Sequence, residues 1–281
     1  MTIHIVTDST SDLTPEQAGA LGVRVVPLTV IFGDEQFLDG VELRADDFYR
    51  RLSKGSVTPT TSQPSPEQFG AVFREQLRGD DDSVLSIHLS QKWSGTVQAA
   101  HLAAKEFDGR VHVVDSGTVS VGIQFLIRAA LRDRGLGTDV TTVVKNTEAR
   151  SKRIVVYVLL DTITFLHRGG RIGRAQAFLG GVLNVKPLLR VVDGEAHPQA
   201  RVRNRQQGIT RLLELVTAAG PLEAVGVMDT DTPEALDDVR RRLEAAYPEL
   251  DLVCGQLGAV VGTYAGPGAI GVAFMRGASS A

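Results

Sequence analysis

Short apolar runs alternate with amphipathic segments through the first 160 residues. Ile3 to Val6, Val84 to Leu89 and Ile154 to Leu160 have the length and β-branched content of buried strands. Between them, Thr14-Pro15 and Ser65-Pro66 each place a capping residue before a proline, with glutamine three positions after the cap, which predicts two helix starts. This alternation is typical of an α/β fold with a parallel sheet covered by helices on both faces, a three-layer α/β/α domain.

The second half of the chain has a different pattern. Val185 to Val192 leads into Asp193-Gly194, a strong two-residue hairpin signal, and single helices are expected, for example from Pro233 to Ala246. Hairpins mixed with single helices predict a two-layer α/β domain with a mixed sheet. We therefore expect residues 1–156 to form the first domain and residues 157–281 the second.

A long segment from Leu257 to Met275 is uncharged. Its length would suit a membrane span, but it contains five glycines and one proline. We predict two buried strands around the turn Gly266-Pro267-Gly268 and no stable membrane insertion. The segment from Gly266 to Gly271 also reads G-x-G-x-x-G, but no helix is expected after it, which argues against a dinucleotide site.

Composition narrows the classes of function. The chain has 281 residues, 30 basic and 33 acidic side chains, a net charge of −3 and one cysteine. This charge gives no reason to expect nucleic-acid binding, and one cysteine excludes an internal disulfide framework and a multi-cysteine metal site. Because Asp8 and Asp12 interrupt the N-terminus before any long apolar run, no signal peptide is expected, and we expect a cytoplasmic protein.

Clustered hydroxyls mark three segments that we expect to connect a strand to a helix. They are residues 7–12 (TDSTSD), 58–63 (TPTTSQ) and 90–96 (SQKWSGT). Ligands of open α/β sheets bind beyond the carboxyl ends of the strands, and helix N-termini offer unpaired N–H donors there. Helix capping is the ordinary use of such residues, and the alternative is a site for an anionic oxygen group.

Other motifs leave several functions open. Gly169 to Gly173 (GGRIG) fits either an anion-binding backbone nest or a tight turn. Ser94 lacks a G-x-S-x-G context, but a serine hydrolase or esterase with Ser94 as nucleophile and His88 as base is an alternative, and a sensor of a small anion is a third. Four carboxylates at predicted strand ends either order loops or hold a divalent cation, and no metal ligand is assigned. They are Asp8, Asp12, Asp115 and Asp161.

Taken in order, these motifs resemble the DegV family, which includes the fatty-acid-binding subunits of bacterial fatty acid kinase. The resemblance rests on Ile5 to Asp12, Thr61 to Ser65, Ser90 to Gln98, Val114 to Ser116, Leu160 to Pro187 and Gly266 to Gly268. It implies a two-domain α/β protein that binds a long-chain fatty acid between its domains. It also implies no cofactor and no catalytic activity of the chain itself.

The resemblance further implies roles for individual residues. The fatty-acid carboxylate would be bound by Thr61, Ser62, Ser94 and Tyr264. Tyr264 stands where the family often has a histidine, and a phenol donates a hydrogen bond but carries no positive charge at pH 7. Arg171, Gly266 and Gly268 are expected near the head group or a partner surface. Arg201 and Arg203 are candidates for docking a partner.

A lipid carrier agrees with elementary energetics. Burying a tail of about 16 carbons contributes up to roughly 12 kcal/mol at about 0.8 kcal/mol per methylene, so a few neutral donors suffice for the head group. Val119 to Leu131 and Phe178 to Leu189 are candidate tunnel walls, with ordinary core as the alternative. We expect a protein that shields a C16–C18 acyl chain and presents its carboxylate to a separate ATP-dependent kinase subunit, which would form acyl phosphate for phospholipid synthesis.

Overall fold

A four-stranded parallel sheet forms the centre of the first lobe. The computed structural model describes residues 2–55, 57–179 and 185–278. The strands follow the order β2-β1-β6-β7, and every neighbouring pair is parallel. Their bounds are β1 (Ile3–Asp8), β2 (Val23–Val26), β6 (Ser83–His88) and β7 (Val111–Asp115).

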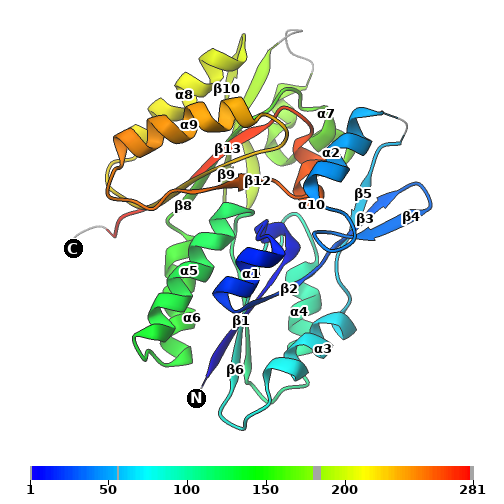
Figure 1. The fold of residues 1–281 in the computed structure, drawn as a ribbon, viewed down its shortest axis with the longest axis vertical. Coiled ribbons are helices and arrows are strands. Elements are labelled where there is room, and N and C mark those ends of the chain that lie inside the picture. The colour runs from blue at the N-terminus through cyan, green and yellow to red at the C-terminus, as the bar shows by residue number, and fades with distance from the viewer. Residues whose placement is uncertain (1, 56, 180–184, 279–281) are drawn as a thin grey trace.

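Helices cover both faces of this sheet, which confirms the three-layer prediction (Figure 1). One face packs on α5 and α6 through Ile123, Leu126 and Val143. The other packs on α3 through Phe69 and on α4 through Ala100. The helices of this lobe are α1 (Pro15–Leu21), α2 (Ala45–Ser53), α3 (Pro66–Gln76), α4 (Thr96–Ala104), α5 (Val121–Gly135) and α6 (Val140–Ser151), with a short 3-10 helix η1 (Ser9–Ser11) after β1.

The two predicted helix starts are confirmed. Thr14 Oγ1 accepts a hydrogen bond from the N–H of Gln17 at 3.2 Å, and the Gln17 side chain accepts from the N–H of Thr14 at 3.0 Å. Ser65 and Gln68 form the same reciprocal pair at the start of α3. Each pair satisfies two backbone donors that the first turn of a helix leaves without an intrahelical partner.

A small antiparallel sheet corrects one prediction. Residues 58–63 do not connect a parallel strand to a helix, because Thr60–Ser62 forms β5, which pairs with β3 (Thr29–Phe32) in the order β4-β3-β5. An antiparallel hairpin joins β3 to β4 (Glu35–Leu38) in this sheet. A three-residue polar strand has no apolar alternation, and its partner lies about thirty positions earlier, so the local pattern could not show it.

A six-stranded mixed sheet forms the second lobe, as predicted. Its order is β10-β9-β8-β13-β11-β12, and only the pair of β11 and β12 is parallel. Helices α8 and α9 cover the face turned away from the first lobe (Figure 1). The elements are β8 (Ile154–Leu159), β9 (Lys186–Val192), β10 (Glu195–Val202), α8 (Arg205–Thr217), β11 (Leu222–Asp229), α9 (Pro233–Ala246), β12 (Val253–Gln256) and β13 (Ile270–Arg276). Before β9 lie α7 (Thr164–Arg168) and the 3-10 helix η2 (Gly173–Phe178).

Strand β8 lies where the two lobes meet. It pairs with β9 and β13 and therefore belongs to the second sheet from Ile154 onward. The boundary expected between residues 156 and 157 falls inside this strand. A division before Ile154 keeps β8 within one unit.

The segment from Leu257 to Met275 contains one strand, not two. Ala259–Ala265 forms the helix α10, and only β13 after it is a strand, so the predicted strand pair is wrong. The N–H groups at the start of α10 are bound by the first lobe: Asp12 accepts from Gly258 at 2.9 Å, and Asp39 accepts from Ala259 at 3.2 Å. Because these acceptors lie far away in sequence, no local capping signal existed.

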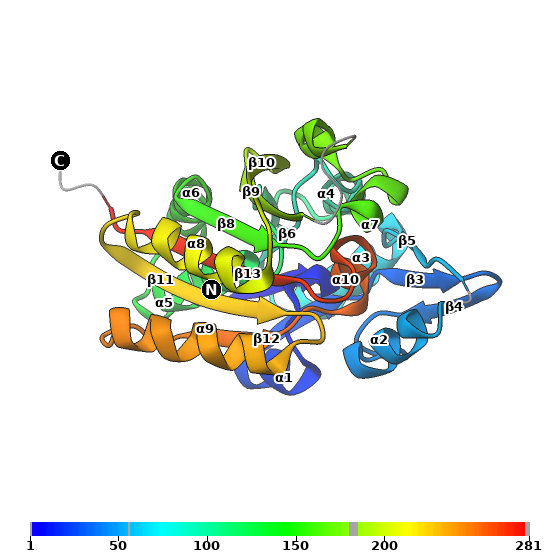
Figure 2. The same ribbon diagram turned by 90° about the horizontal axis from the view of Figure 1, so that it is seen from above.

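Helix α10 packs beside α2 and the small sheet, as Figure 2 shows. Phe48 and Tyr49 of α2 leave no room for a side chain at Gly262 on α10, and Tyr49 donates a hydrogen bond to the Leu257 carbonyl at 3.0 Å. A helix of the second half of the chain is thereby bound to the first lobe. Among the helices of the described residues, none is both long and apolar enough to cross a membrane.

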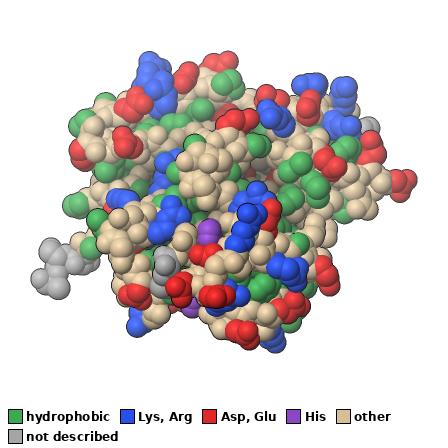
Figure 3. All heavy atoms as spheres, turned by 60° about the horizontal axis from the view of Figure 1, so that its bottom comes forward, with side chains coloured by type: hydrophobic (Ala, Val, Ile, Leu, Met, Phe, Trp, Pro, Cys, Tyr) green, Lys and Arg blue, Asp and Glu red, His purple; other side chains and the backbone are tan. Residues whose placement is uncertain are grey.

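Arginine side chains also join the lobes. Glu223 on β11 accepts from Arg132 at 3.2 Å and from Arg153 at 2.8 Å, and Arg150 binds Asp133 with two hydrogen bonds nearby. Elsewhere basic and acidic side chains are interspersed, as on the face in Figure 3. Part of the arginine content therefore forms ion pairs within and between the lobes.

Candidate functional site

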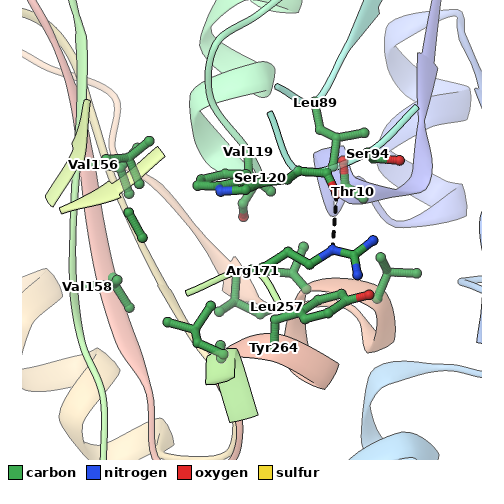
Figure 4. Close-up of a pocket in the computed structure, with 18 of the residues that line it drawn as sticks. Thr10, Leu89, Ser94, Val119, Ser120, Val156, Val158, Arg171, Leu257 and Tyr264 are labelled. Atoms are coloured by element: carbon green, nitrogen blue, oxygen red, sulfur yellow. Dashed lines mark hydrogen bonds between the residues drawn. The ribbon is translucent and has the colours of Figure 1, made fainter. Parts of the chain in front are cut away.

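An elongated cavity of about 440 Å³ lies between the second sheet and the loops of the first lobe (Figure 4). Ser94, Arg171 and Tyr264 gather at one end, while Val156 and Val158 lie toward the other. The cavity thus has a polar end and an apolar end. Its volume is in the range of sites that enclose a small organic ligand.

The apolar end is built from regular secondary structure. On the sheet side, inward residues of β8, β9, β11 and β13 line it: Val156, Val158, Leu189, Val191, Met228, Gly271 and Ala273. On the opposite side, residues around the start of α5 and on or near α10 line it: Val119, Val121, Leu257, Val260, Val261 and Ala265. These walls offer a ligand aliphatic contact and no charge.

The predicted tunnel walls are therefore right in part. Val119, Val121 and Leu189 line the cavity. The middle of the first segment, including Ile123 and Leu126, is buried in the core of the first lobe. Residues 180–184 of the second segment lie outside the described residues.

The polar end brings together hydroxyls from three separate parts of the chain. Thr61 Oγ1 on β5 and the Tyr264 hydroxyl on α10 lie 2.6 Å apart. Ser94 Oγ, in the loop before α4, lies 2.8 Å from Oγ1 of Thr96, the first residue of α4. Ser62 also lines the cavity, at its exposed rim. The structure thus places all four predicted carboxylate-binding residues around one cavity, and their contact with a carboxylate stays a prediction.

Arg171 is the one charged side chain among the described residues that line the cavity. Its Nε donates to the Trp93 carbonyl at 3.1 Å, its Nη1 donates to the Gly169 carbonyl at 2.8 Å, and its guanidinium carbon lies 5.0 Å from the centre of the Tyr264 ring. The first of these bonds crosses from the second lobe to the first. Arg171 therefore holds the polar end together and gives it a positive charge.

The GGRIG segment is a tight turn at the end of α7. Gly170 has φ +71°, its N–H donates to His167, and the N–H of Arg171 donates to Leu166, as in a Schellman helix end. A Cβ at Gly169 would overlap the ring of Tyr264. These glycines therefore allow Arg171 and Tyr264 to lie against each other. Of the two alternatives for this segment, a backbone nest and a tight turn, the structure has the tight turn.

Gly266 and Gly268 shape the turn between α10 and β13. Their φ angles are +72° and +77°, and a Cβ would overlap Phe165 at Gly266 and lie 2.6 Å from Asp161 at Gly268. Neither glycine is among the described residues that line the cavity. Their contact with a head group or partner stays a prediction.

Arg201 and Arg203 lie at the end of the edge strand β10 and away from the cavity lining. The Arg201 guanidinium donates to the Ala177 carbonyl at 3.0 Å and stacks on Phe178, and the N–H of Arg203 donates to the Gln207 side chain. Both residues are exposed. A docking role for them stays a prediction.

The hydrolase alternative does not agree with the structure. His88 is fully buried, its Nδ1 lies 2.9 Å from Asp8 Oδ2, and its Nε2 lies 2.6 Å from Ser86 Oγ. Both ring nitrogens are therefore occupied, and the Ser94–His88 pair is wrong. Ser86, His88 and Asp8 have the connectivity of a catalytic triad, but none of them lines the cavity.

The four strand-end carboxylates bind groups of the protein itself, which agrees with the loop-ordering alternative. Asp8 accepts from Thr10, Asp12 from Gly258, Asp115 from Gly117, and Asp161 binds Lys186 and Arg205. No group of three or more His, Cys, Asp or Glu suited to a metal ion occurs in the part of the chain that the structure describes.

Two of the carboxyl groups near α10 have perturbed acidity. Burial raises the pKa of Asp12 well above its usual value, against hydrogen bonds from Ser120 and Gly258 that lower it. Burial likewise raises the pKa of Asp39 to about 6, opposed by hydrogen bonds from Ser9 and from backbone N–H groups of α10.

Four further lining residues with polar groups have no binding role predicted from the sequence: Thr10, Gln63, Trp93 and Ser120. Thr10, Gln63 and Trp93 lie within the three hydroxyl-rich segments. Their membership in these segments is the sequence signal that could have indicated a place in the cavity lining. Ser120 has φ +58°, which is rare for a residue with a side chain. Its N–H donates to the Thr10 carbonyl at 2.8 Å, which fixes the start of α5 against η1.

The fold and the site together define a class: a two-lobed α/β protein with an elongated cavity, polar at one end, where the lobes meet. A family model described as "Uncharacterised protein, DegV family" matches residues 2–277. The chain belongs to the DegV family.

Relatives of similar length support this membership. A DegV domain-containing protein of Deinococcus radiodurans is 41% identical over 278 residues, covering 98% of each chain. Protein DegV of Bacillus subtilis is 32% identical over 280 residues, covering 98% of this chain and 99% of its own.

Solved structures of the family share the fold. A Thermus thermophilus DegV family protein, described as binding fatty acid, has a TM-score of 0.91 at 38% identity and covers 98% of this chain and 100% of its own. A stearic-acid-binding protein from Eubacterium ventriosum has a TM-score of 0.88 at 26% identity, covering 98% of each chain.

Proposed function

We propose that this protein binds a long-chain fatty acid of about 16 to 18 carbons (C16–C18) in the cavity. The observation that carries the proposal is the cavity itself, with apolar walls and a polar end that holds one guanidinium and several hydroxyls. An amphiphile with one anionic oxygen group matches this division. The fatty-acid-binding descriptions of the Thermus thermophilus and Eubacterium ventriosum structures support it.

We assign the carboxylate to Thr61, Ser62, Ser94 and Tyr264, with Arg171 beside them. Each hydroxyl can donate one hydrogen bond, and a hydrogen bond to a charged group contributes about 1.5–3 kcal/mol. Thr61 and Tyr264 are already 2.6 Å apart, so a carboxylate oxygen would replace or share that contact.

We further propose that the protein is the substrate-carrying subunit of a kinase system in the cytoplasm and not itself an enzyme. A separate ATP-dependent subunit would phosphorylate the presented carboxylate, and the acyl phosphate would enter phospholipid synthesis. Ser62 is exposed where it lines the cavity, and Arg201 and Arg203 are exposed at the end of the edge strand β10, so these side chains are accessible to a partner. The resemblance to fatty acid kinase subunits motivates the partner.

Native mass spectrometry of the purified protein, with extraction of bound lipid, tests fatty-acid binding. We expect a bound mass that matches saturated or unsaturated acids of about 16 to 18 carbons. A protein that stays empty after incubation with hexadecanoic acid, and that hydrolyses esters in a Ser94-dependent reaction, would contradict the proposal.

The head-group assignment is tested by the double variant Thr61→Val with Ser94→Ala. Loss of two hydrogen bonds to a carboxylate should weaken hexadecanoic acid binding about a hundredfold while thermal unfolding changes little. The matched control is Thr60→Val, because Thr60 is the exposed neighbour on β5 and does not line the cavity. Equal binding by the double variant and the control would refute the assignment.

The kinase proposal has its own test. The loaded protein is incubated with ATP and a candidate kinase subunit, and hydroxylamine traps acyl phosphate as a hydroxamate. We expect no hydroxamate from either protein alone. The double variant Arg201→Ala with Arg203→Ala should retain fatty acid but lower the yield of hydroxamate, and an unchanged yield would exclude these arginines from docking.

A further inference from the structure

Strand β13 alternates between large and small side chains according to the face they occupy. Ile270, Val272 and Phe274 point into the core beneath α8 and α9. The residues between them, Gly271 and Ala273, line the cavity on the opposite face. The central strand of the sheet therefore has almost no side-chain bulk where it faces the ligand space.

The fold does not require glycine at position 271. Gly271 is absent from the positions with positive φ, and a Cβ built on it would lie 3.5 Å from the Tyr157 carbonyl and 3.8 Å from Val158 Cβ, which is ordinary contact. At Gly226 of the neighbouring strand, by contrast, a Cβ would lie 2.6 Å from the Val253 carbonyl. Glycine inside a strand reduces stability, and it is used where another group approaches the backbone closely. No group of the described residues does so at Gly271, so space for a ligand is the remaining reason for a glycine there.

The strands beside β13 carry larger side chains and so form the sides of a trough. Gly271 lies between Val158 on β8 and Met228 on β11, and both line the cavity. Ala273 lies beside Val156. The next residue on this face is Met275, which is 1% exposed and packs with Ala273 at the end of the trough.

We propose that Gly271, Ala273 and Met275 set the acyl chain length that the cavity accepts. This inference rests on the proposed fatty-acid function. The acyl chain lies along β13, Gly271 and Ala273 leave room for its distal carbons, and Met275 limits how far the methyl end extends. The three residues thus determine specificity and have no part in binding the carboxylate.

The test measures competition among saturated acids from dodecanoic to octadecanoic acid by native mass spectrometry. Gly271→Val places three carbons in the trough and should shift the bound mixture toward shorter acids. Because each methylene contributes about fourfold in affinity, loss of room for two should lower the ratio of octadecanoic to tetradecanoic acid by roughly fifteenfold. Gly271→Ala should give a smaller shift in the same direction.

Stability provides an independent second measurement. A side chain at position 271 fits the backbone and adds strand propensity, so the ligand-free Gly271→Ala variant should unfold at a slightly higher temperature than the parent. The Gly271→Ala variant should therefore be more stable than the parent without ligand but should bind the longest acid more weakly. An unstable Gly271→Ala variant would contradict the claim that the fold tolerates a side chain there.

The reverse change is Met275→Ala, which should extend the trough and raise the share of octadecanoic acid. Val272→Ala is the matched control, because it removes methyl groups from the opposite face of the same strand. If Met275→Ala does not fold, Ala273→Val replaces it and should shift the mixture toward shorter acids.

The outcomes separate the two proposals. A parent that binds no acid in this mixture overturns the fatty-acid function. A parent that binds acids, with a Gly271→Val variant whose chain-length ratios are unchanged or fall equally at every length, leaves that function in place and overturns the role of β13.

Discussion

The two ends of the cavity are built in opposite ways. At the apolar end, one wall uses alternate residues of four strands in one sheet, so this wall follows from strand register. The polar end joins Thr61 of β5, Ser94 of the loop before α4 and Tyr264 of α10, which lie on both sides of the lobe junction. The affinity contributed by the apolar end should therefore increase step by step with acyl chain length. The affinity contributed by the polar end should instead depend on how the two lobes dock.

The largest expected effect tests the apolar end through the ligand. Hexadecanoic acid has six methylenes more than decanoic acid, so it should bind more tightly by up to about 5 kcal/mol. Isothermal titration below the aggregation threshold of each acid measures the difference. Nearly equal affinities for the two acids would show that the polar end provides most of the binding free energy, and would contradict this difference between the two ends.

The next effect concerns Asp39, which binds the N-terminus of α10. Its pKa is about 6 when folded and 3.8 ordinarily, so the folded protein holds the proton more tightly. This contribution to stability is present below about pH 4 and is lost as the pH rises through about 6. Relative to Asp39→Asn, the free energy of unfolding of the parent should therefore fall by about 3 kcal/mol between pH 3 and pH 7.

Denaturant unfolding at several pH values measures this difference. The amide oxygen that Asp39→Asn introduces can still accept from the N–H of Ala259, so α10 and Tyr264 should keep their places and fatty-acid retention should stay the same. Parallel pH profiles for the two proteins would exclude Asp39 as the titrating group. A loss of retention in the variant would show that the polar end depends on the charge as well as on the hydrogen bond.

A third effect separates the ends directly. Arg171→Met keeps the aliphatic part of the side chain but removes the bond to Trp93 and the positive charge, which should cost about 2 kcal/mol of fatty-acid affinity. The loss should be the same factor for every chain length. Arg201→Met is the control, since Arg201 contacts Ala177 and Phe178 outside the cavity. A loss confined to long acids would assign Arg171 to the apolar end.

The smallest effect is expected for Tyr264→Phe. It removes one hydroxyl beside Thr61 and keeps the ring that stacks with Arg171. Binding of hexadecanoic acid should weaken by about 1 kcal/mol, roughly fivefold, with no change in chain-length preference. Equilibrium binding of two acids of different length measures both quantities, and unchanged affinity would remove Tyr264 from the head-group site.

Local signals predicted much of the fold. The capping pairs at Thr14 and Ser65 and the hairpin at Asp193-Gly194 depend on neighbours within a few positions, and each is present. Thr61 and Ser94 both line the cavity, although Thr61 does not stand in the kind of segment that the sequence predicts. It lies on an antiparallel strand and not at the end of a parallel one.

Features that depend on distant partners could not be predicted in the same way. Helix α10 has small and β-branched residues with weak helix preference, and its start is bound by Asp12 and Asp39, more than two hundred positions earlier. The role of Gly271 depends on the φ angle and on the space around it. A glycine in the printed sequence looks the same whether it serves a turn, close packing or a ligand.

The position of β13 in the second sheet has a consequence for synthesis on the ribosome. β13 lies between β8 and β11, yet it follows both in the chain. Until it emerges, the nascent chain has two partial sheets, each with an open edge, and such edges pair readily with other chains. The same late segment carries α10 to the first lobe. Interrupted synthesis before residue 259 would therefore release a polypeptide prone to aggregation, with neither lobe complete.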